Sequence, residues 1–213
     1  MIRCVLFDFS GTLFRLEPDP GWTDELISVL TASTLAADHL PAELADDWAR
    51  RDLDPELHRS VYLASLAASG LGLSPAKAEA TYERMLEPDS WQPYPDTERA
   101  LKRLRDKGIP VAVVSNIPWD IRRVFRHHGM ADLVDEFVLS YAEGVMKPDA
   151  KIFRVACERL GVAPADALMV GDSAEADGGA AQVGIRTAII EPLPSDRRPA
   201  ALLSTLDDNG LTG

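Results

Sequence analysis

Short runs of apolar residues recur along the chain, and most of them end at a small polar or acidic residue. The runs cover residues 2–9, 110–114, 137–139, 168–170 and 187–190. Short, nearly continuous apolar runs are typical of strands in a parallel sheet that is covered on both faces. The hydrophobic pattern therefore predicts a buried parallel sheet.

Between these runs, apolar residues are spaced three and four apart, as on one face of a helix. The clearest helical patterns cover residues 97–107, 121–128 and 149–160. Each is followed by a glycine, which commonly ends a helix because it accepts a left-handed backbone conformation. Strands that alternate with helices predict an α/β fold whose parallel strands are joined by crossover connections.

One long segment departs from this alternation. From about Arg15 to about Pro93 we find no convincing strand, and helical patterns cover residues 22–38, 41–51, 55–69 and 75–86. We therefore predict a core formed by residues 1–14 and 94–213, with an all-helical insertion at residues 15–93. The segment after Glu191 is rich in proline and aspartate, and we expect it to pack loosely.

The composition narrows the range of partners. The net charge is −12, which argues against nucleic-acid binding, and the arginine pairs at 50–51, 122–123 and 197–198 are expected on solvated surfaces. No apolar run approaches the roughly 20 residues of a membrane-spanning helix. Cys4 and Cys157 lie in apolar runs and are expected as buried free thiols. The apolar start leaves no room for a signal peptide, which favours a cytoplasmic location.

Residues suited to chemistry stand where the predicted strands end. Asp8, Ser115 and Asp172 each lie at or just after the end of an apolar run. Ligands bind at the carboxyl ends of strands in an open parallel sheet. We therefore expect these three side chains, although distant in sequence, to converge on one site.

With their neighbours, these residues form four motifs. The motifs are Asp8-Phe9-Ser10-Gly11-Thr12, Ser115-Asn116, Lys147-Pro148, and Gly171-Asp172 with Asp177. In this order they resemble the motifs of the haloacid dehalogenase (HAD) superfamily, in the subclass that carries a helical cap after the first motif. The resemblance extends from Ile2 to about Glu191. It implies a Rossmann-like core of three layers around a parallel sheet, with the insertion as the cap.

The resemblance also implies a reaction and a cofactor. Asp8 would attack phosphorus and form an aspartyl-phosphate, which divides one difficult displacement into two easier ones. Because a carboxylate and a phosphate repel each other, Mg²⁺ is expected between them. Asp8, Asp172 and the backbone carbonyl of Ser10 are the expected direct ligands. Asp177 would hold a water of the metal, or Lys147, from behind them.

The remaining motif residues are expected to bind the substrate. Lys147 would neutralise charge on the phosphoryl oxygens, and Ser115 would donate a hydrogen bond to them with help from the Asn116 backbone. Thr12 belongs to the same predicted set. Arg15 follows the first motif and is the candidate for binding a second anionic group. The expected partner is a small phosphorylated substrate, and the protein is expected as a monomer or homodimer.

Position 10 departs from the family pattern. The family has a second aspartate there, which protonates the leaving oxygen and then activates water, whereas this chain has Ser10. Losing a general acid–base group typically reduces the rate by about 10² to 10⁴. We predict a Mg²⁺-dependent phosphatase or phosphotransferase that either acts on a good leaving group or uses another acid. The acids nearby in sequence are Glu17, Asp19 and Asp24.

Three alternatives remain open at this stage. A 2-haloacid dehalogenase attacks carbon and needs no acid, but such enzymes generally lack the aspartate found here as Asp172. A phosphonatase uses a lysine of its cap, and Lys77, the lysine of the predicted insertion, lies far along that segment. A non-catalytic descendant would retain the site only to bind a ligand or a protein partner.

Overall fold

The computed structural model describes residues 1–17, 22–23, 26 and 40–213. A sheet of five parallel strands forms its centre, in the order β5-β4-β1-β6-β7. The strands are β1 (Cys4–Phe7), β4 (Val111–Ser115), β5 (Glu136–Leu139), β6 (Ala167–Gly171) and β7 (Arg186–Ile189). All of them fall within or close to the predicted apolar runs, and the predicted parallel sheet is confirmed.

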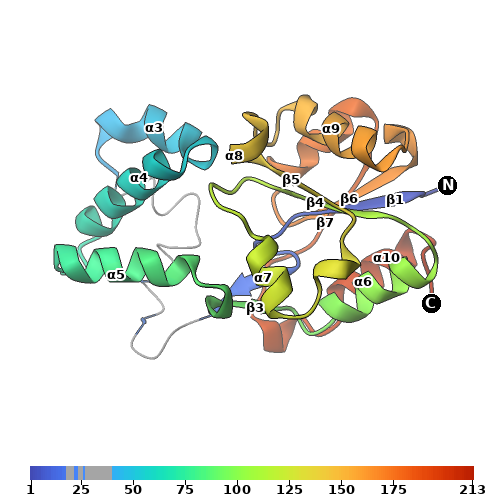
Figure 1. Ribbon diagram of the computed structural model, residues 1–213, viewed down its shortest axis with the longest axis horizontal. Coiled ribbons are helices and arrows are strands. Elements are labelled where there is room, and N and C mark those ends of the chain that lie inside the picture. Colours follow the sequence, from blue (N-terminus) through green and yellow to red (C-terminus); the bar gives the residue numbers. More distant parts are fainter. Residues whose placement is uncertain (18–21, 24–25, 27–39) are drawn as a thin grey trace.

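Helices cover both faces of this sheet, as Figure 1 shows. The core helices are α6 (Thr97–Asp106), α7 (Arg122–His127), α8 (Ser140–Glu143), α9 (Ala150–Leu160) and α10 (Ala201–Asp208). Short 3₁₀ helices join them at Ala131–Leu133 (η4), Pro164–Asp166 (η5), Asp177–Val183 (η6) and Ser195–Arg197 (η7). The helix α9 ends at Gly161 with φ of 65°, as the sequence predicted.

Alternate residues of β1 face the two helical layers. Val5 and Phe7 belong to a core cluster shared with α6, α7 and α10. Cys4 and Leu6 belong to a second cluster shared with α9. Because successive strand side chains point to opposite faces, this central strand is buried on both sides. The observed architecture is the predicted Rossmann-like fold of three layers.

The inserted segment lies beyond the carboxyl ends of the strands (Figure 1). Its described helices are η1 (Ala42–Leu44), α3 (Ala45–Arg50), η2 (Arg51–Leu53), α4 (Pro55–Ala68), α5 (Pro75–Leu86) and η3 (Pro88–Ser90). Residues 41–51, 55–69 and 75–86 were predicted helical and largely are. The helix predicted at residues 22–38 falls mostly outside the described residues.

Two short strands connect the insertion to the core, and here the sequence prediction was wrong. Strands β2 (Phe14–Leu16) and β3 (Trp91–Pro93) pair antiparallel at the two ends of the segment in which we expected no strand. Three residues are too few to show an alternating pattern in sequence. The boundaries of the core and cap at residues 14 and 94 stay a prediction.

The segment after Glu191 packs more firmly than expected. Helix α10 buries Leu202, Leu203 and Leu206 and contacts α6. Arg198, expected on a solvated surface, is buried: its guanidinium lies 3.2 Å from the centre of the Tyr94 ring. The same guanidinium donates hydrogen bonds to the backbone carbonyls of Gly11 and Thr12. The C-terminal segment therefore supports the loop that follows Asp8.

Cys4 and Cys157 are free and buried, as expected. Among the described residues, no helix has the length and apolar character needed to cross a membrane.

Candidate active site

The site forms where the neighbouring strands β4, β1 and β6 end. Asp8 follows β1, Ser115 ends β4, and Asp172 follows β6. The backbone N–H of Asp8 donates to the carbonyl of Val170, which holds the start of the loop that carries Asp8 against β6. All three side chains line one cavity. The convergence expected from the sequence is therefore found in the structure.

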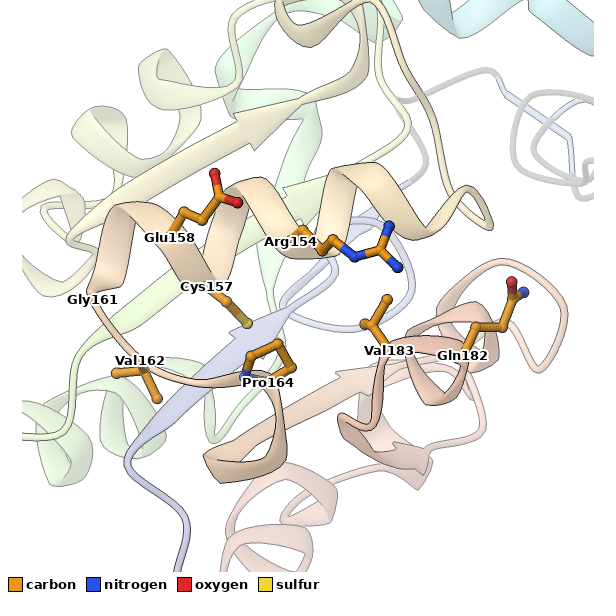
Figure 2. A pocket seen from close by; sticks show the side chains of 8 residues that line it. All are labelled: Arg154, Cys157, Glu158, Gly161, Val162, Pro164, Gln182 and Val183. Atoms are coloured by element: carbon orange, nitrogen blue, oxygen red, sulfur yellow. The ribbon is translucent and has the colours of Figure 1, made fainter.

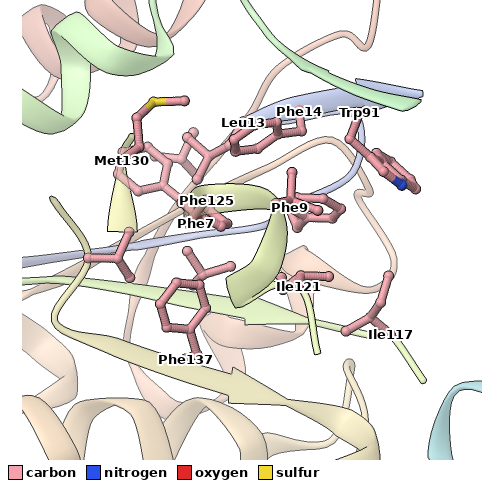
Figure 3. Close-up of a cluster of buried hydrophobic side chains, with 14 of the residues drawn as sticks. Phe7, Phe9, Leu13, Phe14, Trp91, Ile117, Ile121, Phe125, Met130 and Phe137 are labelled. Atoms are coloured by element: carbon pink, nitrogen blue, oxygen red, sulfur yellow. The ribbon is translucent and has the colours of Figure 1, made fainter. Parts of the chain in front are cut away.

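A cluster of aromatic side chains packs around Phe9 in the loop that carries Asp8. Phe9, next to Asp8, is fully buried, and its ring centre lies 4.8 Å from that of Trp91 and 5.2 Å from that of Phe14. Phe125 packs against both Phe9 and Phe14, as Figure 3 shows. Because buried aromatic groups carry large apolar areas, this cluster restrains the backbone on which Asp8 sits.

Lys147 lies between two carboxylates. Its Nζ is 2.7 Å from Asp8 Oδ1 and 2.6 Å from Asp177 Oδ1, and the lysine is almost fully buried. Burial alone would lower the pKa of Lys147, but the charges of Asp177 and Asp8 outweigh it and raise the pKa. Lys147 is therefore a fixed ammonium beside Asp8.

Asn116 holds the Lys147 backbone in place. Its side-chain amide accepts from Lys147 N–H at 2.7 Å and donates to the Lys147 carbonyl at 2.9 Å. The Lys147–Pro148 peptide bond is cis. Asp177 is held in turn by the N–H of Ser173, 2.9 Å from its Oδ2. The Asn116 side chain thus has a positioning role in addition to lining the cavity.

Asp8, Asp172 and Asp177 form a compact acidic cluster. Each offers one carboxylate oxygen, and these oxygens all lie within 4.8 Å of one another. Burial, followed by the charge of Asp8, raises the pKa of Asp172 to about 7. Burial is also the main cause that raises the pKa of Asp8. Three carboxylates around one ammonium leave an excess of negative charge that a hard divalent cation with oxygen ligands would neutralise. The donor set therefore fits Mg²⁺.

Gly11 allows the approach of Asp172. Its φ is 75°, and a Cβ atom built on it would lie 2.3 Å from Asp172 Oδ2. A larger residue would displace this carboxylate and strain the backbone. The glycine of the first motif is thus required by the local geometry.

The cavity has a volume of about 500 Å³ and lies between core and cap. Its core wall includes Asp8, Ser10, Ser115, Asn116, Lys147, Asp172 and Asp177. Its cap wall includes Arg51, Asp52, His58 and Tyr62. As far as described residues form it, the wall includes neither Thr12, which is buried, nor Arg15, which bonds to the Pro192 carbonyl at 3.3 Å. Substrate binding by these two residues stays a prediction.

A family model described as haloacid dehalogenase-like hydrolase matches residues 2–184, which include all of the motif residues. The chain belongs to this family. Three of its motif residues, Asp8, Ser115 and Asp172, meet at the carboxyl ends of neighbouring strands, as the resemblance implied.

The HAD-like relatives carry several activities in their names. Glyceraldehyde 3-phosphate phosphatase of Methanopyrus kandleri is 30% identical over 204 residues, 89% of this chain and 84% of that protein. Haloacid dehalogenase-like hydrolase domain-containing protein 3 of Mus musculus is 37% identical over 122 residues, 55% of this chain. The match covers 49% of the mouse protein, so the chain spans about half the length of such relatives.

Solved structures give the same fold. A HAD phosphatase from Thermococcus onnurineus is 31% identical, with a TM-score of 0.58 and coverage of 89% of this chain and 86% of that chain. The L-2-haloacid dehalogenase of Xanthobacter autotrophicus has a TM-score of 0.69, covering 96% of this chain and 83% of that chain. At 23% identity, this second likeness concerns the fold alone.

Sequence reasoning missed the cap side of this HAD-like site. Arg51 was expected on a solvated surface, yet its side chain is only 13% exposed, and Asp52 and His58 are buried. Arg51 lies 3.6 Å from the Asp52 carboxylate and stacks 4.1 Å from the centre of the Trp48 ring. A charged pair at the end of a helical pattern was the available signal, but nothing local in sequence indicates that it lines the same cavity as Asp8.

A second cavity lies away from the motifs. It is lined by α9, the turn after it and η6, and Figure 2 shows its side chains, among them Arg154, Cys157 and Gln182. None of the motif residues lines it. The candidate site is the cavity lined by Asp8, because the Lys147 ammonium and the acidic cluster meet there.

Proposed function

We propose that this protein is a Mg²⁺-dependent phosphatase or phosphotransferase that acts on a small phosphorylated metabolite through an aspartyl-phosphate on Asp8. The observation that carries this proposal is the Lys147 ammonium, 2.7 Å from Asp8, beside an acidic cluster at the floor of the cavity. In such a site the ammonium attracts an anion and the carboxylates attract a cation. The phosphatase names of the Methanopyrus and Thermococcus relatives support the proposal.

Each motif residue then has a task. Asp8 attacks phosphorus, Lys147 neutralises charge that develops on the phosphoryl oxygens, and the Ser115 hydroxyl donates a hydrogen bond to them. Asp8, Asp172 and the Ser10 carbonyl would hold Mg²⁺, with Asp177 behind them. When bound, the cation supplies positive charge between the nucleophile and the phosphoryl group. Asp177 keeps Lys147 in position through the contact of 2.6 Å.

Ser10 favours a second candidate, a 2-haloacid dehalogenase. Attack on carbon expels a halide, which needs no proton, and a serine at position 10 would not hinder it. The (S)-2-haloacid dehalogenase 4A of Burkholderia cepacia is 34% identical over 98 residues. Asp172 argues against this candidate, because a second carboxylate beside the nucleophile suits a bound cation better than a carboxylate substrate.

Activity measurements separate these candidates. The wild type should release phosphate from p-nitrophenyl phosphate or acetyl phosphate when Mg²⁺ is present and lose this activity in EDTA. Asp8→Asn should lose roughly 10³-fold or more, because the nucleophile is removed. Asp106→Asn, at an exposed position of α6, serves as the matched control and should keep full activity.

Two outcomes would contradict the proposal. Chloride release from 2-chloropropionate without metal, in place of phosphate release, would establish the dehalogenase. Tight binding of phosphate with neither turnover nor a phosphorylated Asp8 would identify a binding protein that no longer catalyses.

A further inference from the structure

A phosphoryl transfer from an alcohol requires a proton for the departing oxygen. The hydroxyl of Ser10 cannot supply it near neutral pH, since its own pKa is far too high. If the protein hydrolyses phosphate esters as proposed above, another group in the cavity must donate this proton. The same group must then take a proton from the water that cleaves the aspartyl-phosphate.

The described cavity wall contains few carboxyl groups that could do so. They are Asp8, Asp52, Asp172, Glu175 and Asp177. The nucleophile and its two partners form the acidic cluster around Lys147. Glu175 is exposed to solvent. Asp52 is the carboxyl group that remains among these residues, and it is buried on the cap wall.

The backbone of Asp52 is fixed to the core. Its carbonyl accepts a hydrogen bond from Ser140 Oγ at 2.5 Å, and Ser140 Oγ in turn accepts one from Ile117 N–H at 2.9 Å. Ile117 follows directly on the Ser115-Asn116 motif. A single hydroxyl therefore connects the cap segment that carries Asp52 to the loop predicted to bind the phosphoryl group.

We propose that Asp52 is the general acid and base of this enzyme, supplied by the cap in place of the aspartate that position 10 lacks. Asp52 belongs to the cap and lines the same cavity as Asp8, Ser115 and Lys147, close enough to Asp8 and Lys147 for their charges to act on its carboxyl group. A residue there can protonate the departing oxygen and afterwards face the water that replaces it.

The surroundings of Asp52 suit this role. Its charged and titratable neighbours are Arg51 at 3.6 Å, His58 at 3.8 Å, Tyr62 and Tyr82 in the cap, and Asp8 and Lys147 in the core. Burial raises the pKa of Asp52 to about 6, although Arg51 and Lys147 act to lower it. Burial also lowers the pKa of His58 to about 3, so this histidine is neutral and has no extra proton to donate.

The two steps balance. In the first, an oxygen of Asp8 bonds to phosphorus, the bond from phosphorus to the leaving oxygen breaks, and the Asp52 proton moves to that oxygen. The products are the alcohol, the aspartyl-phosphate and an Asp52 carboxylate. In the second, water bonds to phosphorus and gives a proton to Asp52, while the bond from phosphorus to Asp8 breaks. Phosphate leaves, and both aspartates return to their starting forms.

The test compares Asp52→Asn with the wild type on two aryl esters that differ in their leaving group. Loss of the general acid should reduce kcat/KM for phenyl phosphate by about 10² to 10⁴ and reduce it much less for p-nitrophenyl phosphate, whose phenolate leaves without a proton. Because the variant also lacks the base, it should release p-nitrophenol in a burst of about one equivalent and then turn over slowly.

A rescue separates catalysis from folding. Adding Ser10→Asp to Asp52→Asn should restore phenyl phosphate hydrolysis by at least about tenfold, since position 10 then carries an acid. Asp46→Asn, at an exposed position of α3, is the matched control and should resemble the wild type. Thermal unfolding of all variants verifies that each is folded.

The outcomes are distinct. Equal losses on both esters without a burst, or no rescue in the double variant, would overturn the role of Asp52 while the phosphatase itself stands. An Asp52→Asn variant that hydrolyses both esters as fast as the wild type would also overturn the role of Asp52. If the wild type releases phosphate from neither ester, the proposed function fails, and the role of Asp52 fails with it.

Discussion

At the scale of single residues, charge is the deciding property of this site. One buried ammonium, Lys147, contacts two carboxylates, and a third lies within the same acidic cluster. Such groups tolerate burial because each has a charged partner. On the cap side, Arg51 and Asp52 form a second, smaller charged pair. The described wall of the cavity therefore carries a charged cluster from the core and a charged pair from the cap.

Arg51 should set the pH range of the reaction. Its positive charge lowers the pKa of Asp52, so replacing it raises that pKa. If Asp52 acts as an acid, activity falls as pH rises through its pKa, and Arg51→Met should move this alkaline limb to higher pH. The limb is measured as kcat/KM for phenyl phosphate between pH 5 and 9.

Arg50→Met is the matched control, because the Arg50 side chain is 64% exposed and pairs with Asp47. Its pH profile should coincide with that of the wild type. An alkaline limb that stays in place in Arg51→Met would show that another group titrates there.

At the scale of elements, the core could be predicted from the sequence, whereas the contacts between elements could not. The run from Ile2 to Phe9 and the pattern of α9 are local signals, and each has a period that the sequence displays. The strands β2 and β3 are too short for a period, and they pair across the whole insertion. Helix α10 was not predicted, because the prolines and aspartates near it indicated a loosely packed segment. Three of its leucines are nevertheless buried.

The same limit applies to the site. Asp8, Lys147 and Asp172 could be found because motifs of recognisable spacing surround them. Asp52 could not, since its approach to the core depends on how the cap is folded and docked. A residue whose role arises from the packing of two distant segments leaves no periodic trace in either segment.

The docking of η2 on the core should depend on Ser140. Ser140→Ala removes the hydrogen bonds to the Asp52 carbonyl and the Ile117 N–H. Losing a buried hydrogen-bond partner costs about 1–3 kcal/mol. We expect kcat/KM to fall roughly 5- to 100-fold, with faster hydrogen exchange at the Ile117 amide.

Ser204→Ala, at an exposed position of α10, provides the comparison and should alter neither quantity. Unchanged exchange at Ile117 in Ser140→Ala would mean that the cap is held at this place by other contacts.

At the scale of the whole molecule, the candidate site depends on segments that lie far apart in the chain. Strand β1 is central in the sheet, so it requires β4 and β6, which come much later in sequence. The loop after Asp8 also requires Arg198, which donates to the Gly11 and Thr12 carbonyls and stacks on Tyr94. The family match ends at residue 184, so this support comes from outside it.

Arg198→Met should therefore weaken both stability and activity. The variant leaves the carbonyls of Gly11 and Thr12 without their donor. Of these two residues Thr12 is buried and Gly11 is half-buried, and one buried group left without its partner costs about 1–3 kcal/mol. The free energy of unfolding, measured with urea, should fall by an amount in this range, and phosphate release should decrease because the nucleophile loop is less restrained.

Arg197→Met is the natural comparison, since Arg197 is exposed next to it. Equal unfolding free energies for the two variants would refute the supporting role of Arg198.

This dependence has a consequence for synthesis on the ribosome. The residues bridged by Arg198 are separated from it by 186 and 187 positions in the chain. At translation rates of about 5–20 residues per second, roughly 10 to 40 s pass between them. A nascent chain thus carries Asp8 long before Arg198 is available to support the loop around it.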